Sequence, residues 1–68
     1  MDYAETGQAL GALEEARAIT THAADLVREL IDGRYSDSAA WKAWAEQNIS
    51  HAVACLNLAK KWLEEVDA

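Results

Sequence analysis

The sequence has no proline, one cysteine and only three glycines in 68 residues, and it has no long apolar run. Without proline, helices in this chain can continue until a glycine or a turn residue ends them. The single cysteine, Cys55, excludes a disulfide within the chain. No segment approaches the ~20 apolar residues that a membrane-spanning helix needs, so we expect no contact with a membrane.

Basic residues are also scarce. Six lysines and arginines stand against 12 acidic residues, which gives a formal net charge of −6. Direct nucleic-acid binding needs cationic side chains that replace counterions, and binding to an anionic membrane needs them too, so the composition argues against both. An acidic chain can instead attract a basic protein surface, or its charge can serve solubility alone. The first six residues lack the positive and apolar regions of a signal peptide, and with a free cysteine they predict a cytoplasmic protein.

The chain is too short to form a large hydrophobic core. A domain of this size buries only roughly 60% of its unfolded surface, and such chains often depend on disulfides, metals or oligomerisation. The composition is nevertheless 51% apolar and 26% charged, which is typical of a folded chain. We therefore expect one small domain that completes its core by pairing with a second copy.

One break divides the sequence into two amphipathic segments. The pattern predicts an all-α, antiparallel two-helix hairpin, with helices over about 2–32 and 37–66 and a turn over 33–36. Gly33 suits the left-handed position that closes a helix. Ser36 and Asp37 are alternative caps for the second helix, and Asp2 and Thr6 are alternative caps for the first.

Apolar residues follow an alternating spacing of four and three in both segments, which is typical of packed helices. The predicted core and dimer positions are Ala12, Ala16, Ile19, Ala23, Leu26, Leu30, Ala45, Ile49, Ala52, Leu56, Ala59 and Leu63. Each row has a neighbouring second row: Leu13, Arg17, Thr20, Ala24, Val27, Ile31, which is apolar except at Arg17 and Thr20, and Trp41, Asn48, Cys55, Trp62. Two adjacent rows favour a homodimer with four helices; the alternative is one broad stripe on a loosely packed hairpin.

Few residues carry recognisable chemistry. His51 and Cys55 share a helix face, and a dimer could align two such pairs into a zinc site, but a small buried thiol is the commoner case. We therefore expect no metal and no cofactor. His22 and His51 lack the glutamate three residues earlier that di-iron bundles use. With no nucleophile motif and no glycine-rich phosphate loop, we expect no catalytic residue and no enzyme.

Acidic and aromatic residues supply a candidate surface for a protein partner. Acids near the end of a helix do not favour its dipole, so the acids of the first helix suggest recognition of a basic partner, with solubility as the ordinary explanation. Aromatic side chains near the turn could act as binding hot spots. The predicted partner-binding residues are Glu14, Asp25, Glu29, Asp32, Arg34, Tyr35 and Trp44. Whether a second subunit covers Trp44, and whether Asn48 fixes the helix register, stays open.

The short acidic chain, its helix–GRYSDS–helix plan and the segment from Ala18 to Gln47 resemble the small accessory proteins with which bacteriophages disable host machinery. Within that group the chain is most similar to the anti-quorum-sensing proteins, which are short all-helical dimers. The resemblance implies inhibition of a host transcription regulator through its DNA-binding region, and a host ATPase of pilus assembly as a second partner. The alternative function is a structural helical module for dimerisation or assembly, without an inhibitory role.

Overall fold

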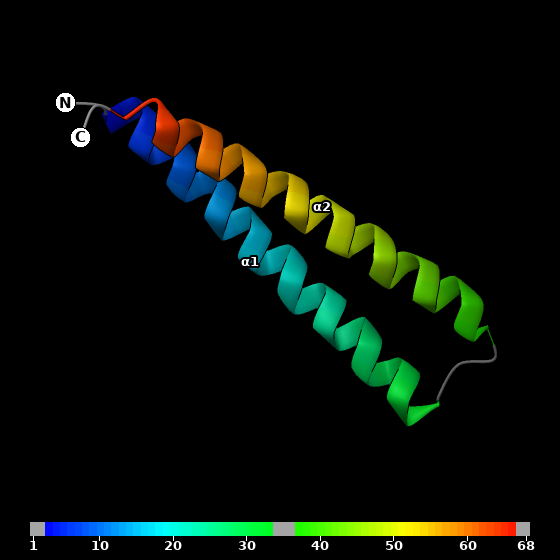
Figure 1. The fold of residues 1–68 in the computed structure, drawn as a ribbon. Helices are drawn as coiled ribbons and strands as arrows, with labels where there is room; N and C mark the ends of the chain where they lie inside the picture. Colours follow the sequence, from blue (N-terminus) through cyan, green and yellow to red (C-terminus); the bar gives the residue numbers. More distant parts are fainter. Residues whose placement is uncertain (1–2, 34–36, 67–68) are drawn as a thin grey trace.

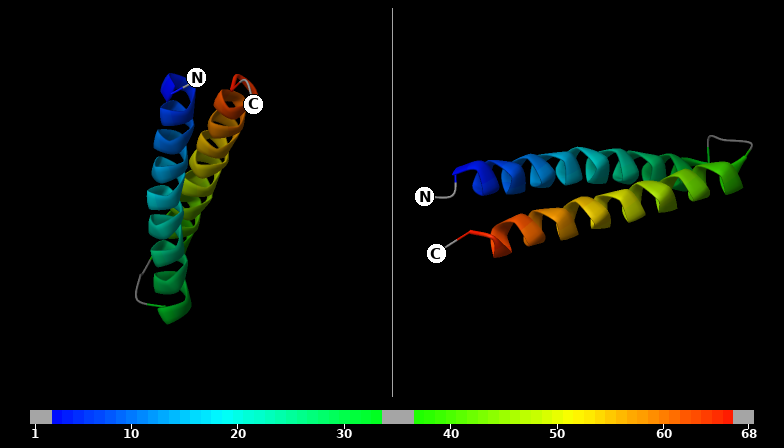
Figure 2. Two further views of the ribbon diagram at one scale, coloured as in Figure 1. Left: turned by 90° about the vertical axis from the view of Figure 1, so that its left-hand side faces the viewer. Right: turned by 90° about the horizontal axis from the view of Figure 1, so that it is seen from above.

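Two long antiparallel helices form the molecule. The computed structural model describes residues 3–33 and 37–66. Helix α1 spans Tyr3–Asp32 and helix α2 spans Ser38–Glu64, and α2 runs back along α1, so that the start of α1 and the end of α2 lie at one end (Figure 1). The hairpin is a rod of 52 × 13 × 13 Å, and Figure 2 shows the helices side by side along their length. The all-α hairpin predicted from the sequence is confirmed.

Local sequence chemistry sets the helix ends. Gly33 has a φ of +67°, which favours glycine, and its N–H donates to the carbonyl oxygens of Glu29 and Leu30 at 3.2 Å. Asp37 caps α2, because its Oδ1 accepts a hydrogen bond from the N–H of Ala40 at 3.0 Å. Thr6 lies inside α1 and does not cap it. Helix α2 ends at Glu64, two residues before the predicted end at position 66.

The seam between the two helices is lined mostly by alanine. The buried residues are Ala9, Ala12, Ala16, Ala23, Leu26, Ala45, Ala52, Cys55 and Ala59. A methyl side chain occupies little space between the helices, so the helix axes can approach closely. Each alanine also buries little apolar surface, and burial stabilises the fold by only roughly 0.8 kcal/mol per CH₂ group. The seam therefore positions the helices accurately but gives the single chain a thin core.

On α2 the seam lies beside the row predicted from the sequence. Ala45, Ala52 and Ala59 are buried as expected, but Ile49, Leu56 and Leu63 are 52%, 48% and 51% exposed. Their places in the seam are taken by the row that includes Asn48, Cys55 and Trp62, whose members are buried or half-buried. Small side chains at Asn48 and Cys55 suit an alanine-lined contact, whereas branched side chains there would hold the helices apart.

Within the single chain, the hydrogen bond of the Asn48 side chain stays inside α2. This side chain is half-buried, and its Nδ2 donates a hydrogen bond to the carbonyl oxygen of Trp44 in the same helix at 2.8 Å. A polar residue specifies register when its partner lies across the interface, and within the single chain this hydrogen bond does not cross to α1.

Two rows flank the seam on each helix and define two long faces of the hairpin. Residues seven apart share a helix face, so the residues just after the seam positions form one row and those just before them form another. We call the first the apolar face: Leu13, Thr20 and Val27 on α1, with Ile49, Leu56 and Leu63 on α2. We call the second the mixed face: Glu15, His22 and Glu29 on α1, with Trp44, His51 and Leu58 on α2.

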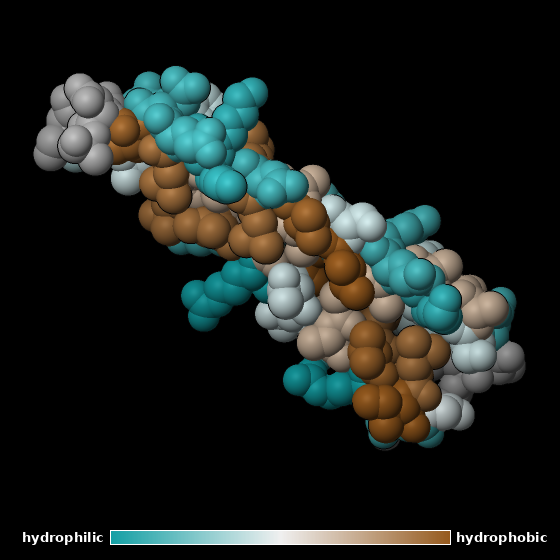
Figure 3. Space-filling view, viewed as in Figure 1, coloured by the Kyte–Doolittle hydropathy of each residue, from teal (hydrophilic) through white to brown (hydrophobic). Residues whose placement is uncertain are grey.

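The structure supports this division directly. Nε2 of His51 lies 3.9 Å from Oε1 of Glu15, so the two rows of the mixed face do line one side of the molecule. Figure 3 looks at the opposite side, where brown, hydrophobic side chains form a band along much of the rod. An exposed apolar stripe of this kind is a common sign of a surface that is covered in the working assembly.

The alanine seam gives a stability prediction. Replacing Ala52 with leucine adds bulk where the helices touch, and we expect it to lower the free energy of unfolding by about 1–3 kcal/mol, the usual effect of overpacking. The matched control is Ala54→Leu, because Ala54 is exposed on the same helix and both substitutions change helix propensity equally. Urea unfolding followed by circular dichroism at one protein concentration measures both. Equal stabilities for the two variants would contradict a tightly packed seam at Ala52.

Candidate functional site

Three side chains with metal-binding or nucleophilic atoms meet at the middle of the hairpin. His51 and Cys55 are one turn apart on α2, and Glu15 approaches them from α1. One ligand atom of each residue lies within 4.8 Å of the others. Glu15 and His51 are exposed at the surface, while Cys55 is buried at the seam below them. We call these three residues the Glu-His-Cys cluster.

The surroundings of Cys55 keep its thiol protonated. Burial raises the pKa of the Cys55 thiol above its ordinary value, and the negative charge of Glu15 raises this pKa further. Because the thiolate is the nucleophile, a thiol with a raised pKa reacts slowly at neutral pH. The site therefore lacks the electropositive surroundings that activate a catalytic cysteine.

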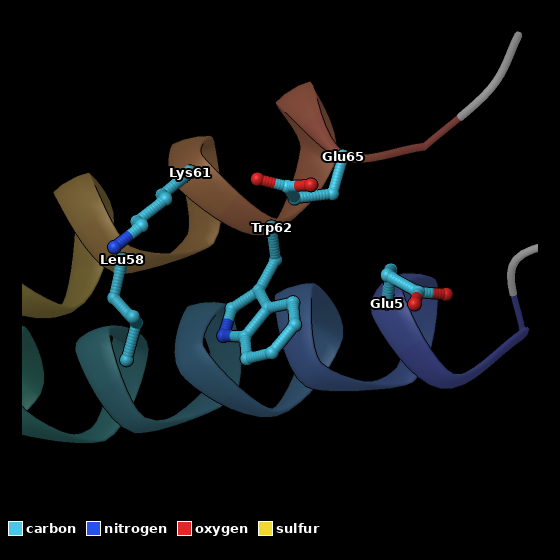
Figure 4. A pocket seen from close by; sticks show the side chains of 5 residues that line it. All are labelled: Glu5, Leu58, Lys61, Trp62 and Glu65. Carbon is cyan, nitrogen blue, oxygen red and sulfur yellow. The ribbon is translucent and has the colours of Figure 1, made fainter.

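A shallow pocket lies at the end of the rod where α1 begins and α2 ends. It has a volume of about 220 Å³ and is lined by Glu5, Leu58, Lys61, Trp62 and Glu65. Figure 4 shows the indole of Trp62 projecting from α2 toward α1, with the carboxylates of Glu5 and Glu65 nearby. Small-molecule sites usually measure about 300–1,000 Å³. A hollow of this size suits one side chain of a partner, and its lining combines an indole and two carboxylates with the ammonium group of Lys61.

Some of the predicted partner-binding residues come together on the mixed face. Trp44 and Glu29 belong to its two rows. Asp25 and Asp32, three residues after His22 and Glu29, lie beside the α1 row on its outer side. Asp25 accepts a hydrogen bond from Nη1 of Arg28 at 2.7 Å, so its charge is partly balanced. Glu15, Glu29 and Asp32 add further carboxylates to this face.

The remaining predicted partner-binding residues do not join this surface. Glu14 lies midway between the buried Ala12 and Ala16, which puts it on the side of α1 that points away from α2. Arg34 and Tyr35 lie outside the described residues. The acidic stripe predicted along α1 is thus divided, with Glu14 apart from the others.

Trp44 is an exposed aromatic side chain held in a defined position. It is 51% exposed, and its ring meets that of Trp41 edge to face, with centroids 5.0 Å apart and an angle of 81° between the planes. Edge-to-face pairs of this kind are favourable beyond the area they bury. Trp41 itself is half-buried, so it holds Trp44 against the rod while leaving much of the outer indole accessible.

Sequence reasoning missed the approach of Glu15 to the pair on α2. The signal was present, because Glu15 comes one residue before the seam residue Ala16, and His51 comes one residue before the seam residue Ala52. In an antiparallel hairpin with a short turn these two positions fall at the same level and on the same side. The pocket around Trp62 was also missed, since it depends on side-chain directions at the helix ends.

Comparisons of the chain with protein-family models, with curated proteins and with solved structures find no match. Among the described residues, neither helix combines the length and the apolar character needed to cross a bilayer.

The raised pKa of Cys55 predicts slow alkylation that Glu15 makes slower. In Glu15→Gln one of the two causes of the shift is removed, so the thiol pKa should fall, the thiolate fraction at pH 8 should rise, and iodoacetamide should react faster. Mass spectrometry of timed samples in a chelating buffer measures the rate. Glu14→Gln is the control, since it removes the same charge on the far side of α1 and should leave the rate close to that of the wild type.

Proposed function

We propose that the protein is a non-enzymatic homodimer that binds a basic surface of another protein through its mixed face. The observation that carries this proposal is the chemical difference between the two long faces of the hairpin. One face is apolar and suits a second copy of the chain; the other combines carboxylates with an exposed tryptophan and suits a partner of opposite charge.

The thin core supports dimerisation through the apolar face. Seven of the nine residues that are buried within the described ranges 3–33 and 37–66 are alanines, so burial within one chain stabilises the hairpin weakly. Ile49, Leu56 and Leu63 follow the seam of α2 as an unbroken row, and Leu13 and Val27 face them from α1. Pairing two such faces about a two-fold axis would bury both rows at once.

The mixed face supports binding to a basic partner. Glu15 and Glu29 lie on its α1 row, Asp32 lies beside them, and the α2 row contributes Trp44 as an aromatic anchor. Tryptophan is enriched among the residues that carry most of the energy of protein interfaces, and surrounding charges mainly raise the association rate. In a dimer joined through the apolar faces, two mixed faces would point outward, so a symmetric partner could be held at two points.

The resemblance to phage inhibitors of quorum sensing suggests which kind of protein this partner is. We propose that the basic surface is the DNA-binding region of a bacterial transcription regulator, and that occupying it inhibits the regulator. Such a region carries the lysines and arginines that contact phosphates, so the acidic face would compete directly with DNA. A host ATPase with a basic surface is a second partner of the same kind.

Dimerisation through the apolar face predicts different effects for two leucines. Leu56 and Leu58 are both 48% exposed, but Leu56 belongs to the apolar face and Leu58 to the mixed face. Leu56→Asp should abolish the dimer, because it places a charge in the interface, whereas Leu58→Asp should leave it intact. Sedimentation equilibrium at micromolar concentration gives the molecular mass. A wild-type chain that is monomeric and folded under these conditions would contradict the proposal.

Charge recognition on the mixed face predicts a second difference. Glu29→Lys should lower the association rate constant with the basic partner and weaken its dependence on salt, while Trp44→Ala should mainly raise the dissociation rate. Glu14→Lys is the control, because it makes the same charge change on the side of α1 that points away from α2. The partner is first isolated by pull-down from bacterial lysate, and rates are then measured by biolayer interferometry from low to high salt.

The same measurements separate the two candidate functions. An acidic inhibitor should lose affinity as salt shortens the Debye length below ~10 Å, and it should compete with DNA for the regulator. A structural assembly module held by apolar contacts should be insensitive to salt. Equal effects of Glu29→Lys and Glu14→Lys would place the binding surface elsewhere, with the pocket at Glu5, Trp62 and Glu65 as the next candidate.

A further inference from the structure

We propose that Glu15, His51 and Cys55 form a binding site for a divalent transition-metal ion of the zinc type, with all three protein ligands supplied by one chain. The proposal is independent of the proposed function, because it needs neither the apolar face nor a protein partner. It goes beyond the expectation from the sequence, in which His51 and Cys55 offered only two ligands and required a dimer to complete a site.

The geometry is close to that of a three-ligand site. In tetrahedral zinc sites the ligand atoms lie about 2.0–2.3 Å from the ion, which places them about 3.3–3.8 Å from one another. Oε1 of Glu15 and Nε2 of His51 are already 3.9 Å apart, and all three ligand atoms lie within 4.8 Å of each other. Glu15 and His51 have exposed side chains, with 60% and 59% of their surface accessible, so small rotations can close the remaining gap.

The framework around the three ligands is firmly fixed. His51 and Cys55 are one helical turn apart, so their side chains project from the same side of α2. Ala52 and Ala16, next in sequence to His51 and Glu15, are buried in the seam, which holds the two helices at close distance there. The ligands from α2 therefore have a fixed spacing, and the ligand from α1 is brought to them by the packing of the alanine seam.

The set of ligand atoms selects the class of ion. A thiolate and an imidazole favour zinc and similar transition metals, whereas calcium and magnesium prefer sites made only of oxygen ligands. Binding would replace the proton of the Cys55 thiol with the metal ion and release that proton to solvent. The thiolate and the Glu15 carboxylate then balance the two positive charges of the ion, and a water molecule can occupy the fourth position.

A metal ion in this position would link α1 directly to α2. The hairpin has no disulfide and a thin core, so a bond between the two helices midway along the rod should stabilise the folded state specifically. Because the unfolded chain does not hold the three ligands together, the binding free energy adds to the folding free energy. The melting temperature should therefore rise progressively with the concentration of free zinc.

The test begins with metal-free, reduced protein titrated with cobalt(II) and then with zinc. Cobalt bound by a thiolate gives a charge-transfer band in the near ultraviolet, so the spectrum identifies Cys55 as a ligand. We expect one cobalt ion per chain, loss of this band when zinc is added, and loss of the band in Cys55→Ser. Glu15→Gln and His51→Gln should each weaken cobalt binding at least about tenfold, since changes even to residues outside the ligand set often cost that much.

Two matched controls separate this site from general attraction between an acidic protein and a cation. Glu14→Gln removes the same charge as Glu15→Gln, and His22→Gln removes the exposed histidine of the mixed face that is not part of the cluster. Both controls should bind cobalt as the wild type does. Circular dichroism should show the same helix content in the Glu14, Glu15, His22 and His51 variants, because these four residues are all exposed.

Several results would overturn the proposal. Absence of the thiolate band at millimolar cobalt would exclude Cys55 as a ligand. Equal weakening by Glu15→Gln and Glu14→Gln would show nonspecific attraction. One ion per two chains would replace the proposed site with one shared between subunits, and an unchanged melting temperature with and without zinc would exclude a link between the helices.

Discussion

The close contact between two alanine-lined helix surfaces is the constraint on which the rest of the structure depends. Small side chains at most seam positions let α1 and α2 approach, and they leave little room there for the larger residues of the chain. Apart from Leu26, many of the large apolar side chains therefore lie on the flanks of the seam and are exposed, among them Val27, Ile49 and Leu56. The hairpin gains a well-defined geometry and gives up the large apolar core that usually stabilises a domain.

This arrangement explains why the molecule has two unlike faces. Each helix carries one row on either side of the seam, and the antiparallel path of the chain brings like-placed rows together. Over residues 13–27 and 49–63 the row that follows the seam is apolar except at Thr20, whereas the row that precedes it carries Glu15, His22 and Glu29 opposite Trp44, His51 and Leu58. The Glu-His-Cys cluster lies where the seam meets the second of these faces, because Cys55 occupies a seam position and its two neighbours occupy the flank.

The sequence predicts the hairpin, the closing glycine of α1 and, as one of two alternatives, the cap at Asp37, because these depend on local chemistry such as the positive φ of Gly33. It predicts the seam of α2 only in part. Ala45, Ala52 and Ala59 belong to two possible rows, and periodicity alone cannot decide whether Leu56 or Cys55 completes the contact. The decision depends on how closely the helices approach, which is a property of both helices together. For the same reason, the pairing of Glu15 with His51 and Cys55 emerges only when the two helices are aligned.

The separation of the two flanking rows also affects how such a chain can evolve. No residue of the apolar face belongs to the mixed face, and a buried strip of alanines lies between them. Under the proposed function, substitutions on the mixed face would change recognition and leave self-association through the apolar face almost unchanged, since residues without shared contacts act almost independently. Related hairpins could then change their binding target through substitutions at a few exposed positions. At the seam, close helix packing would allow mainly small side chains.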